Sequence, residues 1–232
     1  MYHAKKETGK TKERAGKMEI LYSDNNIAVC VKPVGILSES EGMPEALSEA
    51  LGGKFFCVHR LDRAVGGLMV YARNEKAAAQ MSGLFQTGGV TKEYLAVVPD
   101  NLEADRGEMT DLLFHDKQKN HSYTVKRVRA GVKQARLEYE RLCAADGFAL
   151  VKVRLFTGRP HQIRCQFASR KMPLAGDVKY GSTLRESNIA LYSYHLSFVH
   201  PYTKKKTEYY SLPTGKPWES FETGNRLTVS PL

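Results

Sequence analysis

One short segment places a single carboxylate among cations, just ahead of an apolar run. In "VHRLDRAVGGLMVYAR" (58–73), Asp62 is the only acidic residue, and His59, Arg60 and Arg63 lie close to it in sequence. A carboxylate in such surroundings commonly forms a surface ion pair with a neighbouring arginine. A carboxylate where a loop enters a strand, followed by glycines that let another backbone come close, is equally suited to act as a nucleophile. The segment alone leaves both interpretations open.

A second segment gathers hydrogen-bond donors at a predicted turn from strand to helix. In "TGRPHQIRCQFASRKMPLAGDVKYG" (157–181), Arg159, His161, Gln162 and Arg164 fall within six residues, and the one acidic residue comes near the end. Charged surfaces usually mix both signs, so this pattern is unusual. A cluster of donors at the start of a helix is suited to bind a phosphate or a carboxylate.

The overall charge points to a polyanionic partner. The 232 residues include 35 Lys and Arg against 25 Asp and Glu, a net charge of +10. Such an excess favours nucleic-acid binding, because neutralising phosphates releases counterions. Residues 1–17 carry six of the cations and no hydrophobic period. They predict either a mobile basic arm that binds the partner or a tail that only aids solubility.

Composition also limits which class of protein this chain can belong to. Hydrophobic residues make up 42% and charged residues 26% of the chain, which is typical of a globular protein. No apolar run has the length of a membrane span, and the N-terminus has no apolar core of a secretory signal. We therefore expect a cytoplasmic protein without a membrane partner, and we expect a monomer.

The order of the predicted elements favours one α+β domain. Apolar and alternating runs predict strands over 27–31, 68–72 and 91–99, and Asp146–Gly147 marks a tight hairpin turn. This order lacks the regular strand–helix alternation of a doubly wound fold. We expect residues 18–232 to form a single domain on a largely antiparallel mixed sheet with flanking helices and loops.

Two helices have recognisable ends. Asn74 can cap a helix that Gly88 would end, and Pro160 can begin a second one. Residues 100–134 are polar and irregular, which predicts short strands and a long surface loop.

Several familiar sites are missing from the sequence. "GLFQTGGVTK" lacks the lysine of a phosphate loop, and neither a Gly-x-Ser-x-Gly elbow nor a His-Glu-x-x-His pair occurs. The closest cysteines, Cys143 and Cys165, are 22 positions apart, so no Cys-x-x-Cys spacing exists. We expect no cofactor and no metal. A metal site built from His59, Asp62 and His161 is an alternative that spacing does not exclude.

Six segments resemble, in order, those of the RluA-type RNA pseudouridine synthase family between positions 20 and 201. The signature His-Arg-Leu-Asp followed by a Gly-Leu strand is similar to "HRLDRAVGGLMVYAR". The other five are "VKPVGIL", "KEYLAVV", "TGRPHQIR", "PLAGDVKYG" and "LSFVHP". Val65–Gly66 stands where the family commonly has Thr-Ser, and "LYSYHLSF" lacks its usual His-Ala pair. We expect no S4 RNA-binding module, because 17 basic-arm residues cannot form one.

The resemblance implies a pseudouridine-synthase-like domain that isomerises specific uridines in structured rRNA or tRNA without a cofactor. Asp62 would then be the nucleophile, and Arg164 would be the matched cation that supports its charge. Tyr94 would be the active-site tyrosine, which stacks on uracil or transfers a proton. Without this context, Tyr94 would be read as an ordinary core aromatic.

Further residues would contact the RNA. Arg60 would either fill the space left by a flipped base or bind a phosphate, and Leu196 would line the uracil pocket. The expected RNA-contacting residues are Arg60, His59, Arg63, Arg159, His161, Gln162 and Leu196.

Two other functions compete with this interpretation. The first is a catalytically idle RNA-binding or ribosome-assembly factor on the same fold, which the presence of Asp62, Tyr94 and Arg164 disfavours. The second is a metal-dependent RNA hydrolase, which would need a cluster of carboxylates that the sequence does not show.

Overall fold

The structure is a computed structural model that describes residues 18–184, 186 and 188–222. The predicted basic arm, residues 1–17, lies outside the described residues. The strands, in chain order, are β1 (Glu19–Ser23), β2 (Ile27–Lys32), β3 (Phe56–Cys57), β4 (Gly66–Ala72), β5 (Val90–Pro99), β6 (Arg106–Asp116), β7 (His121–Val125), β8 (Val132–Ala145), β9 (Phe148–Leu155), β10 (Leu191–Val199) and β11 (Lys206–Tyr210). The helices are α1 (Met43–Leu51), α2 (Glu75–Thr87), α3 (Gln162–Ala168) and α4 (Glu219–Glu222), with a short 3-10 turn, η1 (Val178–Tyr180).

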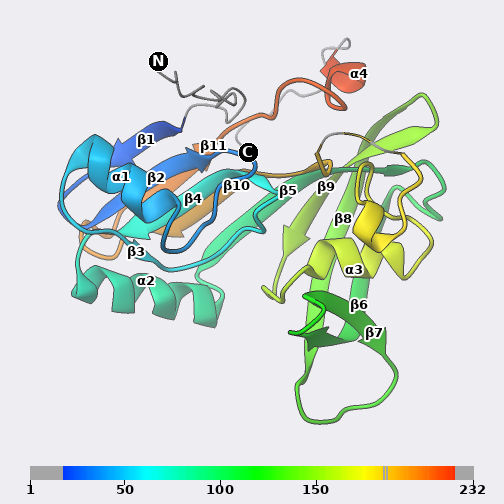
Figure 1. Cartoon of the computed structure of the whole chain (residues 1–232), viewed down its shortest axis with the longest axis horizontal. Helices are drawn as coiled ribbons and strands as arrows, with labels where there is room; N and C mark the ends of the chain where they lie inside the picture. Colours follow the sequence, from blue (N-terminus) through cyan, green and yellow to red (C-terminus); the bar gives the residue numbers. More distant parts are fainter. Residues whose placement is uncertain (1–17, 185, 187, 223–232) are drawn as a thin grey trace, which may run out of the picture.

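The eleven strands form one mixed sheet (Figure 1). Its order is β1-β2-β4-β10-β5-β9-β8-β6-β7, with β11 beside β10 and β3 beside β4. β4 and β10 pair in parallel, whereas the other strand pairs of the described chain are antiparallel. This arrangement confirms the predicted α+β class on a largely antiparallel sheet.

Helices α1 and α2 cover opposite faces of the β1–β2–β4 half of the sheet (Figure 1). Successive strand residues point to opposite faces. In β2, Ala28 and Cys30 therefore pack in the core cluster that contains the apolar residues of α1, whereas Ile27 and Val29 pack in the cluster that contains Met81 of α2. The predicted ends of α2 are confirmed: the side chain of Asn74 accepts a hydrogen bond from Ala77 N, and Gly88 adopts the left-handed conformation.

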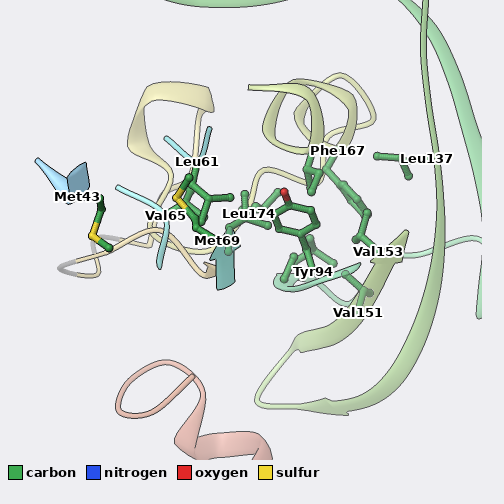
Figure 2. Packing of buried hydrophobic residues seen from close by; sticks show 14 of the residues in the cluster. Met43, Leu61, Val65, Met69, Tyr94, Leu137, Val151, Val153, Phe167 and Leu174 are labelled. Atoms are coloured by element: carbon green, nitrogen blue, oxygen red, sulfur yellow. The ribbon is translucent and has the colours of Figure 1, made fainter. Parts of the chain in front are cut away.

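The other half of the sheet, from β5 to β7, carries α3 (Figure 1). The larger core cluster runs through both halves. Figure 2 shows Tyr94 of β5 between Leu61 and Val65 on one side and Phe167 of α3 on the other. Tyr94 thus sits where the loop before β4 meets the packing beneath α3.

Gly67, at the start of β4, allows this strand to approach β10 closely. Gly67 has φ +114°, and a Cβ built there would lie 2.2 Å from the carbonyl oxygen of Ser193 in β10. The expectation that small residues permit close approach of another backbone is confirmed at this position.

Two expectations about local structure are wrong. Residues 106–116 and 121–125 form β6 and β7, and β8 begins at Val132, so the expected long surface loop is mostly paired strand. Cross-strand pairing of β6 with both β8 and β7 supports these polar residues, which carry little apolar signal of their own. Helix α3 begins at Gln162 and not at Pro160, because His161 is in the left-handed region with φ 52°.

No helix in the described ranges is long and apolar enough to cross a membrane.

Candidate active site

Asp62 is held in a turn that links β3 to β4. The amide of Val65 donates to the carbonyl of Asp62 at 2.9 Å, which closes the turn. Leu61 and Val65 are buried on either side, and Ser38 bonds both the amide and the carbonyl of Leu61. About a quarter of the Asp62 side chain stays exposed, at 26%. Buried neighbours therefore fix the backbone while the carboxylate reaches the surface.

A buried lysine ties this turn to the end of β2. The Lys32 ammonium donates to the carbonyl of Pro33 at 3.0 Å, to that of Ile36 at 2.9 Å and to that of Arg63 at 3.5 Å. Burial lowers the pKa of Lys32 to about 8, and the charge of Asp62 opposes that shift. The sequence analysis did not assign Lys32 to the site. The available signal was a lysine at the end of an apolar strand, directly before Pro33.

Arg164 joins Asp62 to a second, buried carboxylate. Its Nε and Nη2 donate to Oδ2 and Oδ1 of Asp177 at 2.7 and 2.9 Å, and its Nη1 donates to Oδ2 of Asp62 at 2.8 Å. Burial opposes the charged form, but hydrogen bonds and charges from Asp177 and Asp62 raise the pKa of Arg164. The guanidinium therefore stays charged, and its two hydrogen bonds to Asp177 fix the direction in which Nη1 points toward Asp62. Asp177 was missing from the predicted site.

Tyr94 and His161 complete the surroundings of Asp62. Burial raises the pKa of the Tyr94 phenol, and the charge of Asp62 raises it further, so the hydroxyl is protonated at neutral pH. His161 Nε2 lies 3.7 Å from Oδ2 of Asp62, and burial lowers the pKa of this imidazole to about 4. The site thus contains one carboxylate, one guanidinium, one neutral phenol and one neutral imidazole.

Gln162 and Arg159 shape the turn before α3. The side-chain oxygen of Gln162 accepts from Thr157 Oγ1 at 2.8 Å and from the Arg159 amide at 3.0 Å, so this residue braces the backbone. Arg159 is partly exposed, and its Nε donates to the carbonyl of Gln134 at 2.9 Å. Its terminal nitrogens form no hydrogen bond within the described residues, which leaves them able to bind an anion.

Arg60 and Arg63 lie on the surface beside Asp62. Arg60 pairs with Glu39 at 3.0 Å, and both side chains are more than half exposed. Arg63 donates from Nε to the carbonyl of Gly35 at 2.8 Å. Exposed contacts of this kind hold a side chain weakly, so both cations can turn toward an anionic partner.

Two predicted residues lie away from this group. His59 stacks on Phe85 with ring centroids 4.3 Å apart, and its Nε2 accepts from the Val70 amide. Leu196, which was expected to line the uracil pocket, is completely buried with Val70 and Met81 beneath α2, in a different cluster from Tyr94. Pairing between β10 and β5 shifts register at residues 193–195.

The described residues contain no group of three side chains of the His, Cys, Asp or Glu type placed to hold a metal. The alternative set of His59, Asp62 and His161 is not assembled in them, because His59 packs against Phe85. The chemistry offered by the described side chains is that of a carboxylate with a paired cation, which can attack an electrophilic carbon.

Comparison with known proteins places this arrangement in a family. A family model described as "RNA pseudouridylate synthase" matches residues 26–169. The chain is 32% identical over 212 residues to an "Uncharacterized RNA pseudouridine synthase" of Aquifex aeolicus, covering 79% of this chain and 66% of that relative. It therefore spans just under two thirds of the length of that protein.

A second relative is matched over most of its length. The "Dual-specificity RNA pseudouridine synthase RluA" of Haemophilus influenzae is 30% identical over 196 residues, covering 80% of this chain and 89% of the relative. The solved structure "Human RNA Pseudouridylate Synthase Domain Containing 4" has the same fold, with a TM-score of 0.71, 23% identity and coverage of 84% of this chain and 88% of that one. The protein belongs to the RluA-type family of RNA pseudouridylate synthases.

Proposed function

We propose that this protein converts specific uridines in structured RNA to pseudouridine, with Asp62 as the nucleophile. The observation that carries the proposal is the Asp62–Arg164 ion pair, in which a partly exposed carboxylate is held by a buried guanidinium. The reaction breaks the bond between uracil N1 and ribose C1′, turns the base and joins C5 to C1′. A proton leaves C5 and a proton is gained at N1, so the product is an isomer of the substrate.

Asp62 has two ways to assist this reaction. Its carboxylate can capture C1′ as a covalent ester, or it can help the base depart while a 2′ proton is lost. Arg164 already bonds Oδ2, and no hydrogen bond to Oδ1 forms within the described residues. Oδ1 is therefore the oxygen that we assign to the reacting carbon.

We assign Tyr94 to contact with the uracil base of the substrate. Its hydroxyl is protonated at neutral pH because burial and the charge of Asp62 raise its pKa. A neutral phenol can stack on the flipped uracil or donate a hydrogen bond to it. Both roles fit its position in the core beside Leu61 and Phe167 (Figure 2).

The substrate proposal rests on charge and on the names of relatives. The net charge of +10 and the exposed Arg60 and Arg63 favour an RNA backbone. One relative is named for dual specificity, and a second Haemophilus influenzae relative, 29% identical over 217 residues, is named "tRNA pseudouridine synthase C". We propose a target uridine in rRNA or tRNA.

Mapping pseudouridines in total RNA from cells with and without the protein tests this function. Loss of one or a few sites in rRNA or tRNA, restored by the wild-type chain but not by Asp62→Asn, is the expected result. Identical maps with and without the protein would favour the catalytically idle RNA-binding factor.

A further inference from the structure

The imidazole of His161 has a defined neighbour at each ring nitrogen. Nδ1 lies 3.0 Å from the hydroxyl of Tyr180, and Nε2 faces Oδ2 of Asp62 at 3.7 Å. Burial lowers the pKa of the ring to about 4, so at neutral pH it carries a single N–H. The nitrogen that bears this hydrogen decides whether His161 offers Asp62 a donor or a lone pair.

Tyr180 determines which nitrogen that is. Its hydroxyl oxygen accepts a hydrogen bond from the backbone amide of Ser122 at 2.8 Å. The phenol has one hydrogen of its own, and burial raises its pKa to about 12, so it keeps that hydrogen. The Ser122 side chain also lies against this hydroxyl, but its Oγ already donates to the carbonyl of Pro160 and contacts His115 Nδ1, so we assign the phenol hydrogen to His161 Nδ1. Tyr180 therefore donates to Nδ1, and the ring hydrogen resides on Nε2, directed at Asp62.

The network behind the ring holds this arrangement in place. Ser122 Oγ donates to the carbonyl of Pro160 at 2.6 Å, which ties β7 to the residue before His161. Tyr180 is stacked on His121 with centroids 4.2 Å apart, and the guanidinium of Arg164 lies 4.9 Å from its ring. The Tyr180 ring is thus held by contacts with His121 and Arg164, and its oxygen is held by the Ser122 amide.

We propose that His161, fixed as its Nε2–H tautomer by Tyr180, is a positioning residue for Asp62, a role that rests on the proposed function. Its N–H faces the same oxygen, Oδ2, that Arg164 bonds, so two donors orient one oxygen and leave Oδ1 for the ribose. A separation of 3.7 Å closes to a hydrogen bond with a small movement, as such contacts commonly do when substrate binds.

Two substitutions at His161 separate this role from a structural one. The amide nitrogen of His161→Gln reaches the position of Nε2, whereas that of His161→Asn reaches only the position of Nδ1. Residue 161 has φ 52°, a conformation that asparagine accepts more readily than glutamine. A purely structural role would therefore favour Asn.

We expect His161→Gln to keep its single-turnover rate within about tenfold of wild type at saturating RNA, and His161→Asn to lose about 100-fold, the scale of a 1 Å misplacement. An Asn variant as fast as the Gln variant would overturn the proposal. If the wild type makes no pseudouridine in any RNA tested, the proposed function fails instead, so the two failures are distinct.

Nitrogen-15 NMR of the labelled protein tests the tautomer directly. We expect the His161 ring to show Nε2–H in the wild type and a mixture of tautomers in Tyr180→Phe. Tyr123→Phe, on the same strand as Ser122 but with a partly exposed ring, serves as the control and should leave the signal unchanged. An Nδ1–H signal in the wild type, or an unchanged Nε2–H signal in Tyr180→Phe, would contradict the proposal.

Discussion

At the scale of single residues, the site depends on how one guanidinium is divided between two carboxylates. Arg164 uses two nitrogens on buried Asp177 and a third on Asp62. Asp177 therefore fixes the direction in which the remaining nitrogen reaches Asp62. A point charge at the same position would neutralise the carboxylate without orienting it.

Arg164→Lys tests this division. The lysine keeps the charge but cannot reach both carboxylates in a fork, so Asp62 loses its orientation. We expect the single-turnover rate at saturating RNA to fall by about 100-fold on paired and unpaired target uridines alike. Arg170→Lys, which alters a partly exposed pair with Asp111, is the matched control and should stay near the wild-type rate. Equal rates for Arg164→Lys and the control would contradict the orienting role.

Arg60 is expected to behave differently from Arg164. Its pair with Glu39 is exposed, so the side chain is free to enter a helix of RNA. If Arg60 replaces the flipped base, Arg60→Ala should be slow on a paired target and nearly normal on an unpaired one, because unstacking then costs little. The same two RNAs at saturating concentration provide the measurement. Equal losses on both would assign Arg60 to phosphate contact.

At the scale of elements, sequence reasoning succeeded where local signals and tertiary structure agree. The cap at Asn74 and the left-handed Gly88 bound α2 as predicted, and Asp146–Gly147 forms the turn between β8 and β9. Short strands were expected over 100–134, but the extent of strand there was not, because pairing of β6 with β8 and β7 holds residues with little apolar periodicity.

Parts of the site could not be predicted for related reasons. The hydrogen bonds of Lys32 join residues that are far apart in the chain, such as Arg63. Arg164 is bound by Asp177, which in the sequence is simply the one acidic residue of a basic segment. The packing of Leu196 beneath α2 depends on contacts with β4 and α2 that its own segment does not reveal. Asp62, Tyr94, His161 and Arg164, by contrast, are brought together as the motif order suggested.

Gly67 tests the contact between β4 and β10. A Cβ there would meet the Ser193 backbone at 2.2 Å, and φ is +114°. We expect Gly67→Ala to lower the free energy of unfolding by more than about 2 kcal/mol, because both backbone strain and the close contact oppose a side chain. Gly83→Ala in α2, where nothing lies within 4 Å, is the control and should be neutral or stabilising by up to about 1 kcal/mol. Urea denaturation compares them, and equal effects would contradict the account.

At the scale of the whole molecule, the site lies between the two halves of one sheet. Asp62 comes from the loop before β4, and Arg164 comes from α3, which packs on the half formed by β5 to β7. The continuous sheet fixes the position of the Asp62 loop relative to α3, so the same packing supports both stability and activity.

That packing holds two histidines neutral, which predicts loss of stability in mild acid. Burial lowers the pKa of His59 to about 3 and that of His161 to about 4, against an ordinary value of 6.5. Between pH 6.5 and about 4 the unfolded chain binds more protons than the folded one. The free energy of unfolding should therefore fall as pH decreases through this window, by about 1.4 kcal/mol per pH unit for each histidine.

Urea denaturation at pH 7.5 and at pH 5.0 measures this dependence. His59→Phe removes one of the two titrating groups. The slope of the free energy of unfolding against pH should therefore decrease by the contribution of about one proton, and a pH-independent change in stability would not affect this slope. A free energy of unfolding that stays level between the two pH values would contradict the burial of neutral imidazoles.

The central claim, that Asp62 performs the chemistry on uridine, is tested most directly by tritium release from RNA labelled at uridine C5. Pseudouridine formation frees that hydrogen, so release reports turnover. For Asp62→Asn we predict a rate lower by a factor on the order of 10³ or more, with RNA affinity close to wild type, because the amide keeps the shape but cannot act as a nucleophile. Asp111→Asn, which breaks the Arg170 pair instead, should release tritium like the wild type. Wild-type release by Asp62→Asn would contradict the account.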